Sequence, residues 1–336
     1  MRTKLVLHSR LKTQRGERRR LRCKHCNRTF VSTRGTVYYR LRRPRAVVDR
    51  VTRARVDGVA PAVIARVEGV SQGTISRWRE RTARHAWRFT HEHLRIDWPV
   101  ELQFDELKGM GATEESDTWV YNCIEVWTRV WASWRVARRT LRSTTVVARE
   151  ARDRLRCITE PVLCTSDEMK YYPSSLKRAF EKFCVHVQVD NRYSSGRLVR
   201  TNWKLIWGPK WRLDAARSRS EDSKKPNTSY VERLHLTVRR GCSYLHRRTN
   251  GRMRKRRCLG ENLALQHCHY NFVRPHASLK LGKQKRTPAM QAGIFDRPLT
   301  LREIFSWVPK PDPWLDRLPV DESRRQDPFR ARPSNS

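Results

Sequence analysis

The spacing of apolar and polar residues changes along this chain and divides it into regions with different predicted structure. In residues 44–95 apolar residues recur at intervals of three and four, which is the spacing of one face of an α-helix. From residue 98 the spacing becomes two, so that Val100, Leu102 and Phe104 fall on one face of a strand and Asp105 falls on the other. We therefore expect a helical region followed by a region built around a β-sheet.

Three helices are predicted in residues 44–95. Pro61 suits the first turn of the second helix, and Ser71 is an N-cap for a third helix that runs to about His85. Two short helices followed by a basic third helix are typical of a helix-turn-helix, whose third helix enters the major groove of DNA. The residues expected to face DNA are Gln72, Ser76 and Arg77 at base edges, and Arg79, Arg81 and Arg84 at phosphates. The alternative is a three-helix connector whose arginines are merely solvated.

The second region shows strands and helices in the order βββαβαβ. Strands are predicted at 98–105, 118–126, 130–137, 162–167 and 185–189, with helices at 143–156 and after Pro173. This order predicts an α/β fold with a mixed five-stranded sheet and flanking helices. A further helix begins near Asn227 and runs to about Leu245, and another covers 260–272.

Two segments lack a clear period. Residues 190–227 are polar and basic and are broken by Ser-Ser-Gly and Gly-Pro, so we expect an insertion without long elements, in which Trp203, Trp207 and Trp211 form a local apolar patch or a base-stacking platform. Residues 296–336 are rich in proline and are expected to be loosely ordered beyond Asp312.

Charge restricts the partners of this protein. The chain has 336 residues, with 73 Lys and Arg against 33 Asp and Glu, and therefore a formal net charge of +40. Such an excess favours a polyanionic partner, with double-stranded DNA preferred over an anionic membrane surface. No apolar run approaches the length of a membrane span, no secretory signal is visible, and the nine cysteines are an odd number, so we expect reduced thiols and a cytoplasmic, nucleoid-associated protein.

The first 43 residues form a basic arm, in which Arg20 is expected to hold phosphates. Within it, Cys23 and Cys26 have the spacing of one knuckle of a zinc ribbon, so their thiolates could be two of the ligands of a Zn²⁺ ion. A ribbon needs a second knuckle, and the preceding stretch offers only His8. We therefore expect a partial zinc ribbon, and a half ribbon without metal is the alternative.

Three acids stand out in a chain with few carboxylates. Asp105 lies on the first predicted strand, Asp167 closes the fourth, and Glu232 lies on the helix after the fifth. Because the first and fourth strands are neighbours in a sheet of this order, Asp105 and Asp167 should face one another and repel unless a cation lies between them. Mg²⁺ or Mn²⁺, which prefer oxygen ligands, are the expected metals, with Glu232 as the third ligand.

Four further residues lie close to these acids in the sequence and could take part in the same site. Glu106 and Glu168 adjoin the two aspartates but are expected to point to the opposite side of their strands. His235 and Arg239 follow Glu232 on the same helix face, where they either hold a phosphate or pack against acids. A site for two ions would support in-line attack on phosphorus without a covalent intermediate.

Six segments of the chain resemble bacterial insertion-sequence transposases of the InsA–InsB type, in matching order and spacing over about residues 20–295. The segments are Arg22-Cys-Lys-His-Cys-Asn-Arg-Thr-Phe30, Tyr38-Tyr-Arg-Leu-Arg-Arg-Pro44, Phe104-Asp-Glu-Leu107, Thr165-Ser-Asp167, Thr228-Ser-Tyr-Val-Glu-Arg-Leu-His-Leu-Thr-Val-Arg239 and Tyr270-Asn-Phe-Val-Arg-Pro-His-Ala-Ser-Leu279.

The resemblance implies an RNase H-like catalytic domain with a DDE triad, here Asp105, Asp167 and Glu232, and metal-dependent cleavage and joining of DNA ends. It also implies that the zinc ribbon and helix-turn-helix recognise terminal inverted repeats, and that Arg274 and His276 lie near the site and contact DNA.

The resulting prediction is a DNA transposase that works as a homo-oligomer on DNA and has no membrane partner. Its expected parts are the arm at 1–43, the helix-turn-helix domain at 44–95, the catalytic domain at 96–295 with an insertion at about 190–227, and the tail at 296–336. The alternatives are a DNA-binding repressor or an inactive copy without catalysis, and an RNase H-like nuclease that cuts without joining.

Overall fold

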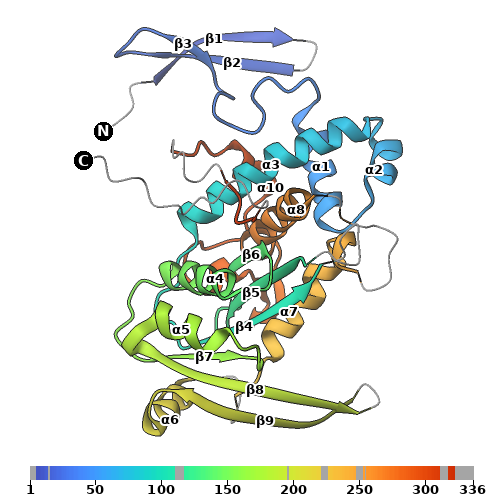
Figure 1. Ribbon diagram of the computed structural model, residues 1–336. Coiled ribbons are helices and arrows are strands. Elements are labelled where there is room, and N and C mark those ends of the chain that lie inside the picture. The colour runs from blue at the N-terminus through green and yellow to red at the C-terminus, as the bar shows by residue number, and fades with distance from the viewer. Residues whose placement is uncertain are drawn as a thin grey trace, which may run out of the picture.

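The computed structural model describes residues 5–13, 16–109, 117–194, 197–220, 226–246, 253, 255–310 and 317–321. Its centre is a mixed six-stranded sheet with helices on both faces (Figure 1). The sheet consists of β4 (Glu101–Lys108), β5 (Trp119–Glu125), β6 (Trp131–Ala137), β7 (Val162–Ser166), β8 (Cys184–Ser194) and β9 (Arg197–Trp207), in the spatial order β6-β5-β4-β7-β8-β9. The predicted mixed α/β class is confirmed.

The number of strands is a correction, because the sheet has six rather than five. Strand β8 is about twice as long as the strand expected at 185–189, and the chain returns as β9, antiparallel to β8, within the segment expected to lack long elements. Helix α6 (Lys210–Arg219) follows β9, and its Leu213 and Ala216 join an apolar cluster with residues of β7 and β8. The Ser-Ser-Gly sequence therefore separates two paired strands rather than ending the sheet.

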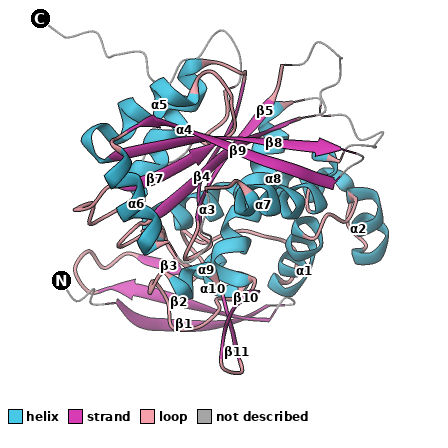
Figure 2. Ribbon diagram, turned by 90° about the horizontal axis from the view of Figure 1, so that it is seen from below, coloured by secondary structure: helices cyan, strands magenta, loops and turns pink. Residues whose placement is uncertain are grey.

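Helices cover both faces of the large sheet, which explains why β4, β5, β6 and β7 are almost fully buried, whereas the edge strand β9 is half-buried or exposed. Helices α4 (Leu141–Arg154) and α5 (Tyr172–Phe180) lie on one face, and α6 and α7 (Ser229–Arg240) lie on the other (Figure 2). The side chain of Thr140, not Ser143, caps α4 by accepting a hydrogen bond from the backbone N–H of Ser143 at 3.2 Å.

Three helices precede the sheet where the sequence predicts them: α1 (Arg45–Val56), α2 (Pro61–Glu68) and α3 (Gln72–His93). Pro61 occupies the first turn of α2, and the Ser71 hydroxyl accepts a hydrogen bond from the Thr74 N–H at 3.2 Å at the start of α3. Helix α3 is longer than expected because its second half, with Trp87 and Phe89, is buried in the body of the protein. The role of these helices in DNA recognition stays a prediction.

The N-terminal arm forms a second, separate sheet with the order β1-β2-β3 (Figure 1). Its strands are β1 (Leu5–Thr13), β2 (Gly16–Cys23) and β3 (Thr29–Val31), all antiparallel. None of its described side chains is buried. The chain then enters the body, where Val37 and Tyr38 are buried.

The C-terminal part of the chain packs against α3 and the large sheet. Its elements are α8 (Arg256–Cys268), which continues as a π-helical turn (His269–Val273), β10 (His276–Leu281), β11 (Gln284–Arg286), α9 (Pro288–Gln291) and α10 (Leu301–Ser306). Within the segment predicted as a Pro-rich tail, Ile304 and Phe305 are buried, and Val320 forms a bridge with Val136 of β6. Residues 311–316 and 322–336 of that segment lie outside the described residues. No helix in the described part of the chain is long and apolar enough to cross a membrane.

Candidate active site

The register of two parallel strands brings the first two predicted acids together. Phe104 of β4 is paired with Ser166, the last residue of β7, so the next residues, Asp105 and Asp167, lie at the same level, although β4 continues to Lys108. One oxygen of each carboxylate and one of Glu106 lie within 4.8 Å of one another. The expectation that these two strands are neighbours and that Asp105 and Asp167 face each other is thus confirmed, while their catalytic role remains a proposal.

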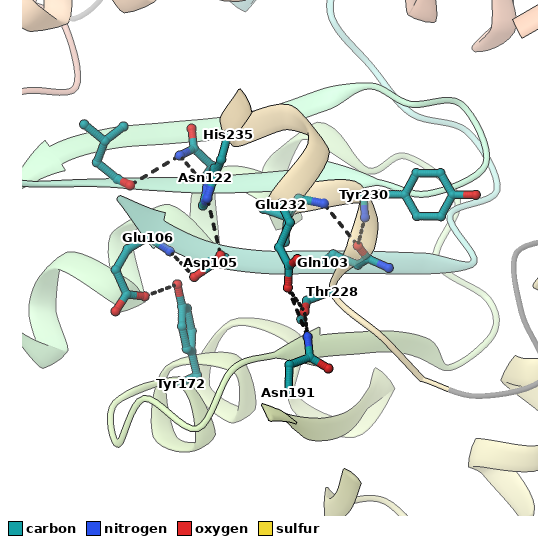
Figure 3. Close-up of polar contacts among 12 residues, drawn as sticks. Gln103, Asp105, Glu106, Asn122, Tyr172, Asn191, Thr228, Tyr230, Glu232 and His235 are labelled. Atoms are coloured by element: carbon teal, nitrogen blue, oxygen red, sulfur yellow. Dashed lines mark hydrogen bonds and ion pairs between the residues drawn. The ribbon is translucent and has the colours of Figure 1, made fainter. Parts of the chain in front are cut away.

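Glu106 lies on the strand face opposite to Asp105, as predicted, yet its carboxylate still reaches the two aspartates. It accepts a hydrogen bond from Arg139 at 2.6 Å. It accepts a second from the Tyr172 hydroxyl at 3.1 Å, on the side of α4 and α5 (Figure 3). Alternation along a strand does put Glu106 on the face opposite to Asp105. However, β7 ends at this level, so both faces of β4 open onto one space and the Glu106 carboxylate reaches the other two acids.

A buried glutamine fixes the start of the helix that carries the third predicted acid. The Gln103 side-chain oxygen accepts hydrogen bonds from the backbone N–H groups of Tyr230 at 2.9 Å and Val231 at 3.2 Å (Figure 3). These groups belong to the first turn of α7, where backbone donors lack partners within the helix. Gln103 is completely buried and lies two residues before Asp105, so it sets the position of α7 relative to the acid on the same strand face.

His235 lies one turn after Glu232 on α7 and contacts Asp105 directly. Its Nδ1 is 3.3 Å from the Asp105 carboxylate, and its Nε2 is 3.2 Å from the amide nitrogen of Asn122. The same amide nitrogen donates to the Val120 carbonyl at 3.3 Å, which orients the Asn122 amide as a donor toward Nε2. The Nδ1 atom therefore carries the imidazole proton and donates it to Asp105. Of the two roles that the sequence left open for His235, packing against an acid is the one observed.

Glu232 faces this group but is not part of it, which corrects the expectation that three acids meet. Its carboxylate accepts hydrogen bonds from the Thr228 hydroxyl at 2.9 Å and the Asn191 amide at 3.0 Å (Figure 3). Thr201 of β9 in turn donates to the Asn191 side-chain oxygen at 3.0 Å. The sixth strand, which the sequence assigned to a loop, therefore helps to hold this acid.

Burial and mutual repulsion disfavour the charged forms of the clustered acids. Burial, with the nearby Asp167 and Glu106 charges and that of Glu232, raises the pKa of Asp105 well above its usual range. Burial and the Asp167 charge raise the pKa of Glu106 to about 7, although Arg139 opposes the shift. Burial also raises the pKa of Asp167. Burial lowers the pKa of His235 to about 3, so its imidazole is neutral and offers no compensating charge.

This donor set fits a hard divalent cation. Three carboxylates that converge within 4.8 Å repel one another, and a cation bound between them would remove that cost. Mg²⁺ and Mn²⁺ bind oxygen ligands of this kind, and Mg²⁺ commonly uses one or two carboxylates together with substrate phosphates. Asp105, Glu106 and Asp167 are the residues that would hold it.

The predicted DNA-reading residues divide into exposed and buried groups. Gln72, Ser76, Arg77 and Arg84 are exposed on α3, as expected. Arg77 and Arg84 line a cavity of about 380 Å³ beside residues 35–37, together with the half-buried Arg81, which donates to the Tyr39 carbonyl at 2.6 Å. This surface is positively charged and faces solvent.

Arg79 is a correction, because it is not available to a phosphate. Its guanidinium forms a 2.7 Å ion pair with Glu261 of α8, and the two side chains are 11% and 3% exposed. A buried pair of this kind stays charged because each partner compensates the other, so its function is to join α3 to α8. The pairing partner is distant in sequence, and the sequence alone gives no sign of it.

The N-terminal cysteines lie on the turn between β2 and β3. Cys23 is half-buried, Cys26 is exposed, and hydrogen bonds from the backbone at Cys26 and His25 lower the pKa of the Cys23 thiol. A structural zinc ion takes four ligands, and among the described residues no third His, Cys, Asp or Glu converges on this pair. The described residues therefore do not complete a zinc site with this pair. Arg20 of β2 is exposed, as expected of a phosphate contact.

The remaining predicted contacts lie away from the acid cluster or beside it on α7. Arg239 is half-buried in the last turn of α7. Arg274 is exposed beside Tyr270, and His276 packs its ring edge-on against the Tyr270 ring at 4.4 Å while its Nε2 lies 3.2 Å from the Tyr270 carbonyl. The contacts of His276 are thus with Tyr270.

Comparison of the chain with protein-family models finds no match, and comparison with curated proteins finds no match either. What the site can do is therefore argued from its own geometry and charge.

Proposed function

We propose that this protein is a DNA transposase of an insertion sequence, with a metal-dependent catalytic domain of the RNase H-like class. The observation that carries the proposal is the placement of Asp105 within β4 beside Asp167 at the end of the adjacent parallel strand β7, with their carboxylate oxygens gathered beside Glu106. The strand order supports the class, since three antiparallel strands are followed by two parallel strands on the far side of the first, as the order βββαβαβ requires.

The chemistry follows from the donor set. In-line attack on phosphorus by a water or a 3′-hydroxyl would be assisted at this site, because a Mg²⁺ or Mn²⁺ ion held there would lower the pKa of the attacking group and stabilise the leaving oxygen. Asp105 and Asp167 would hold it through oxygens that are already close. The His235 Nδ1–H occupies one oxygen of Asp105 and so fixes the direction of the other lone pairs of that carboxylate.

The third acid has two candidates on opposite faces of β4. Glu106 already lies with the two aspartates, and Arg139 and Tyr172 hold it there. Glu232 faces Asp105 closely enough to disfavour the ionised form of Asp105, but Asn191 and Thr228 hold its carboxylate. We propose that Glu232 completes the site when DNA is bound, in keeping with the resemblance, and that Glu106 supports it.

A positively charged surface next to the catalytic domain supports action on DNA. Arg77 and Arg84 are exposed on α3, and the arm with Arg20 carries a large excess of arginine and lysine. Such surfaces bind phosphates of either strand regardless of sequence, while exposed polar residues at the start of a helix read base edges. We propose that α3 and the arm bind the DNA ends that the catalytic domain cuts.

The proposal is tested by cleavage of a supercoiled plasmid that carries this protein's own gene with its flanking DNA, in the presence of Mg²⁺. We expect Asp105→Asn, Asp167→Asn and Glu232→Gln each to abolish nicking and joining while binding to the same DNA is unchanged. Glu168→Gln is the matched control, because Glu168 adjoins Asp167 but is exposed.

Each outcome decides a separate point. Cleavage retained by Asp105→Asn or Asp167→Asn would overturn the proposed active site, and loss in Glu106→Gln with full activity in Glu232→Gln would make Glu106 the third acid. Binding to the flanking DNA without any cleavage by the unaltered protein would identify a repressor or an inactive copy. Nicking without joined products would identify a nuclease.

A further inference from the structure

A groove that the proposed chemistry does not use runs along helix α4. Its volume is about 990 Å³, and it lies between α4, the second half of α3 and residues 317–320. We call it the α4 groove. Helix α4 begins two residues after Arg139, the residue that binds Glu106 of the acid cluster, so one end of the groove lies near the proposed active site.

The α4 groove is strongly positive. Its lining contains seven arginines and only two acids, Glu150 and Asp153, and therefore has five net positive charges. Arg142 and Arg149 are exposed and lie two turns apart on α4. Arg154, in contrast, is buried and binds the Thr90 and His91 carbonyls at 3.3 and 3.2 Å, so it shapes the floor rather than offering itself to a ligand.

The rest of the lining is apolar and aromatic. Leu141, Val146, Leu318 and Val320 line the groove together with Trp87. The Trp87 side chain is 5% exposed, and its Nε1 is buried without a hydrogen-bond partner in the part of the protein that the structure describes. A buried indole N–H usually has an acceptor. Because the Nε1 of Trp87 has almost no accessible surface, Trp87 contributes apolar surface to the groove rather than a hydrogen bond to a ligand.

Exposed cations beside apolar walls match the two parts of a nucleotide. Single-stranded nucleic acid binds to positively charged grooves that follow its backbone, with apolar and aromatic surfaces against its bases. A duplex buries its bases and presents phosphates on a wide outer surface, whereas a cavity of about 990 Å³ has the size of a site for a small ligand or a few nucleotides.

We infer that the α4 groove binds an unpaired single strand of DNA. The inference rests on the proposed function. It adds that a DNA strand extending from the acid cluster along α4 is single-stranded. Arg142 and Arg149 contact successive phosphates, and bases lie against the wall formed by Trp87, Val146 and Leu318.

The test is binding of fluorescein-labelled dT15 followed by anisotropy, without divalent cations, at several salt concentrations. We expect the double variant Arg142→Ala and Arg149→Ala to bind dT15 roughly 20-fold more weakly at 0.1 M salt and to lower the salt slope by about 1.4, since each phosphate contact with a single strand contributes about 0.7. Binding of a 15-base-pair duplex should change by less than about twofold.

The matched control is the double variant Arg138→Ala and Arg152→Ala, which removes the same charge from residues at or next to α4 that do not line the groove. An equal loss in the control, or an equal loss for duplex and single strand, would reduce the effect to general charge and overturn the inference. Thermal unfolding of both variants shows whether either has lost its fold.

Two competitors distinguish other ligands from a DNA strand. Thymidine monophosphate that displaced dT15 at comparable concentration would identify a free nucleotide as the ligand, and a polyglutamate of equal charge that did so would identify an acidic protein segment; either result would overturn the inference. Ultraviolet cross-linking of dT15 containing 5-iododeoxyuridine should label the peptide with Trp87 or residues 318–320, and labelling confined to other peptides would also overturn it.

These measurements separate the inference from the proposed function, because they use no metal and no cleavage. If Asp105→Asn abolishes cleavage while the double variant Arg142→Ala and Arg149→Ala binds dT15 normally, only the inference about the α4 groove is wrong. If the groove variant loses dT15 binding while the unaltered protein never cleaves DNA, only the proposed catalytic activity fails.

Discussion

The two sheets of this protein have opposite relations to solvent. Strands β6 and β7 of the large sheet are buried along their whole length, whereas the small sheet β1–β3 has no buried side chain among those described. The large sheet has acids where β7 ends beside β4, and the small sheet carries arginines such as Arg18, Arg19 and Arg20. The protein thus separates its charges, with carboxylates gathered at the large sheet, where we propose a cation site, and guanidinium groups on the small sheet, where we propose contacts with DNA.

This difference in burial shows that the two β-sheets are stabilised by different interactions. The large sheet is stabilised by burial of apolar surface on both faces. Among its described residues, the small sheet has apolar side chains that are at most half-buried, such as Leu21 and Phe30, so its backbone hydrogen bonds contribute a larger share of its stability. Changes in the large sheet should therefore alter folding and catalysis, and changes in the small sheet should alter binding only.

The largest effect is expected in the core of the large sheet. Trp134 of β6 is completely buried, so Trp134→Ala should lower the free energy of unfolding by about 4 kcal/mol, because it leaves a cavity. Leu7 of β1 is 48% exposed, so Leu7→Ala should change the free energy of unfolding by less than about 0.5 kcal/mol. Urea denaturation measures both, and comparable losses would contradict the contrast between the sheets.

The acids of the large sheet should make its stability depend on metal. Mg²⁺ at a hundred times its dissociation constant should stabilise the protein by about 2.7 kcal/mol, because it binds the folded site alone. Asp105→Asn should remove this gain, while the exposed Glu168→Gln should keep it. Thermal unfolding with Mg²⁺ and with EDTA provides the measurement. A gain that survives in Asp105→Asn would place the metal elsewhere.

The sixth strand should affect cleavage through the Glu232 carboxylate. Asn191→Ala removes the amide that donates to Glu232, and we expect cleavage to fall about 10- to 100-fold, as for other residues that orient a metal ligand. Asn202→Ala on β9 is the control, since Thr201, not Asn202, contacts Asn191. Rates of plasmid nicking under single-turnover conditions give the comparison. Equal rates for Asn191→Ala and the unaltered protein would show that Glu232 needs no such support.

Buried histidines should make the body, but not the small sheet, sensitive to acid. Burial between α3 and α10 lowers the pKa of His85 from 6.5 to about 4. At pH 5.5 the unfolded chain binds this proton and the folded protein does not, so stability is lost as the pH falls below 6.5, by about 1.4 kcal/mol at pH 5.5. His85→Gln should remove that part of the loss, whereas His8→Gln, at an exposed position of β1, should not. Denaturation at pH 7.5 and 5.5 tests this, and a slope unaffected by His85→Gln would refute it.

The smallest effect is expected from single arginines that contact DNA. Arg20→Ala in the small sheet should weaken binding to every DNA equally and lower the salt slope by about 0.9. Arg77→Ala at the start of α3 should relax sequence preference instead. Titrations with the flanking DNA and with unrelated DNA at several salt concentrations measure both. Identical behaviour of the two variants would show that the arm and α3 do not divide anchoring from recognition.

Much of the fold follows from local patterns in the sequence. Alternation along β4 and the order of strands predicted that Asp105 and Asp167 would be neighbours, and Ser71 and Pro61 marked the starts of two helices. The helix starts depend on residues close together in the chain, and the contact of Asp105 with Asp167 follows from the order of locally predicted strands. Local signals of that kind are visible in a sequence without a structure.

The features that escaped prediction depend on contacts between distant segments. Alternation gives the face of β4 to which Glu106 belongs, but not that β7 ends beside it and leaves both faces open. The ion pair of Arg79 with Glu261 joins two helices far apart in the chain, so an exposed phosphate contact was expected in its place. The polar composition of 190–227 concealed β9, whose role in holding Asn191 is visible only in the assembled sheet.

The hydrogen bonds from Thr201 to Asn191 and from Asn191 to Glu232 have a mechanical consequence. They tie the carboxylate on α7 to both strands of the β8–β9 hairpin, so the third predicted acid is anchored at the edge of the sheet. We expect that a displacement of this hairpin would change the position of the Glu232 side chain.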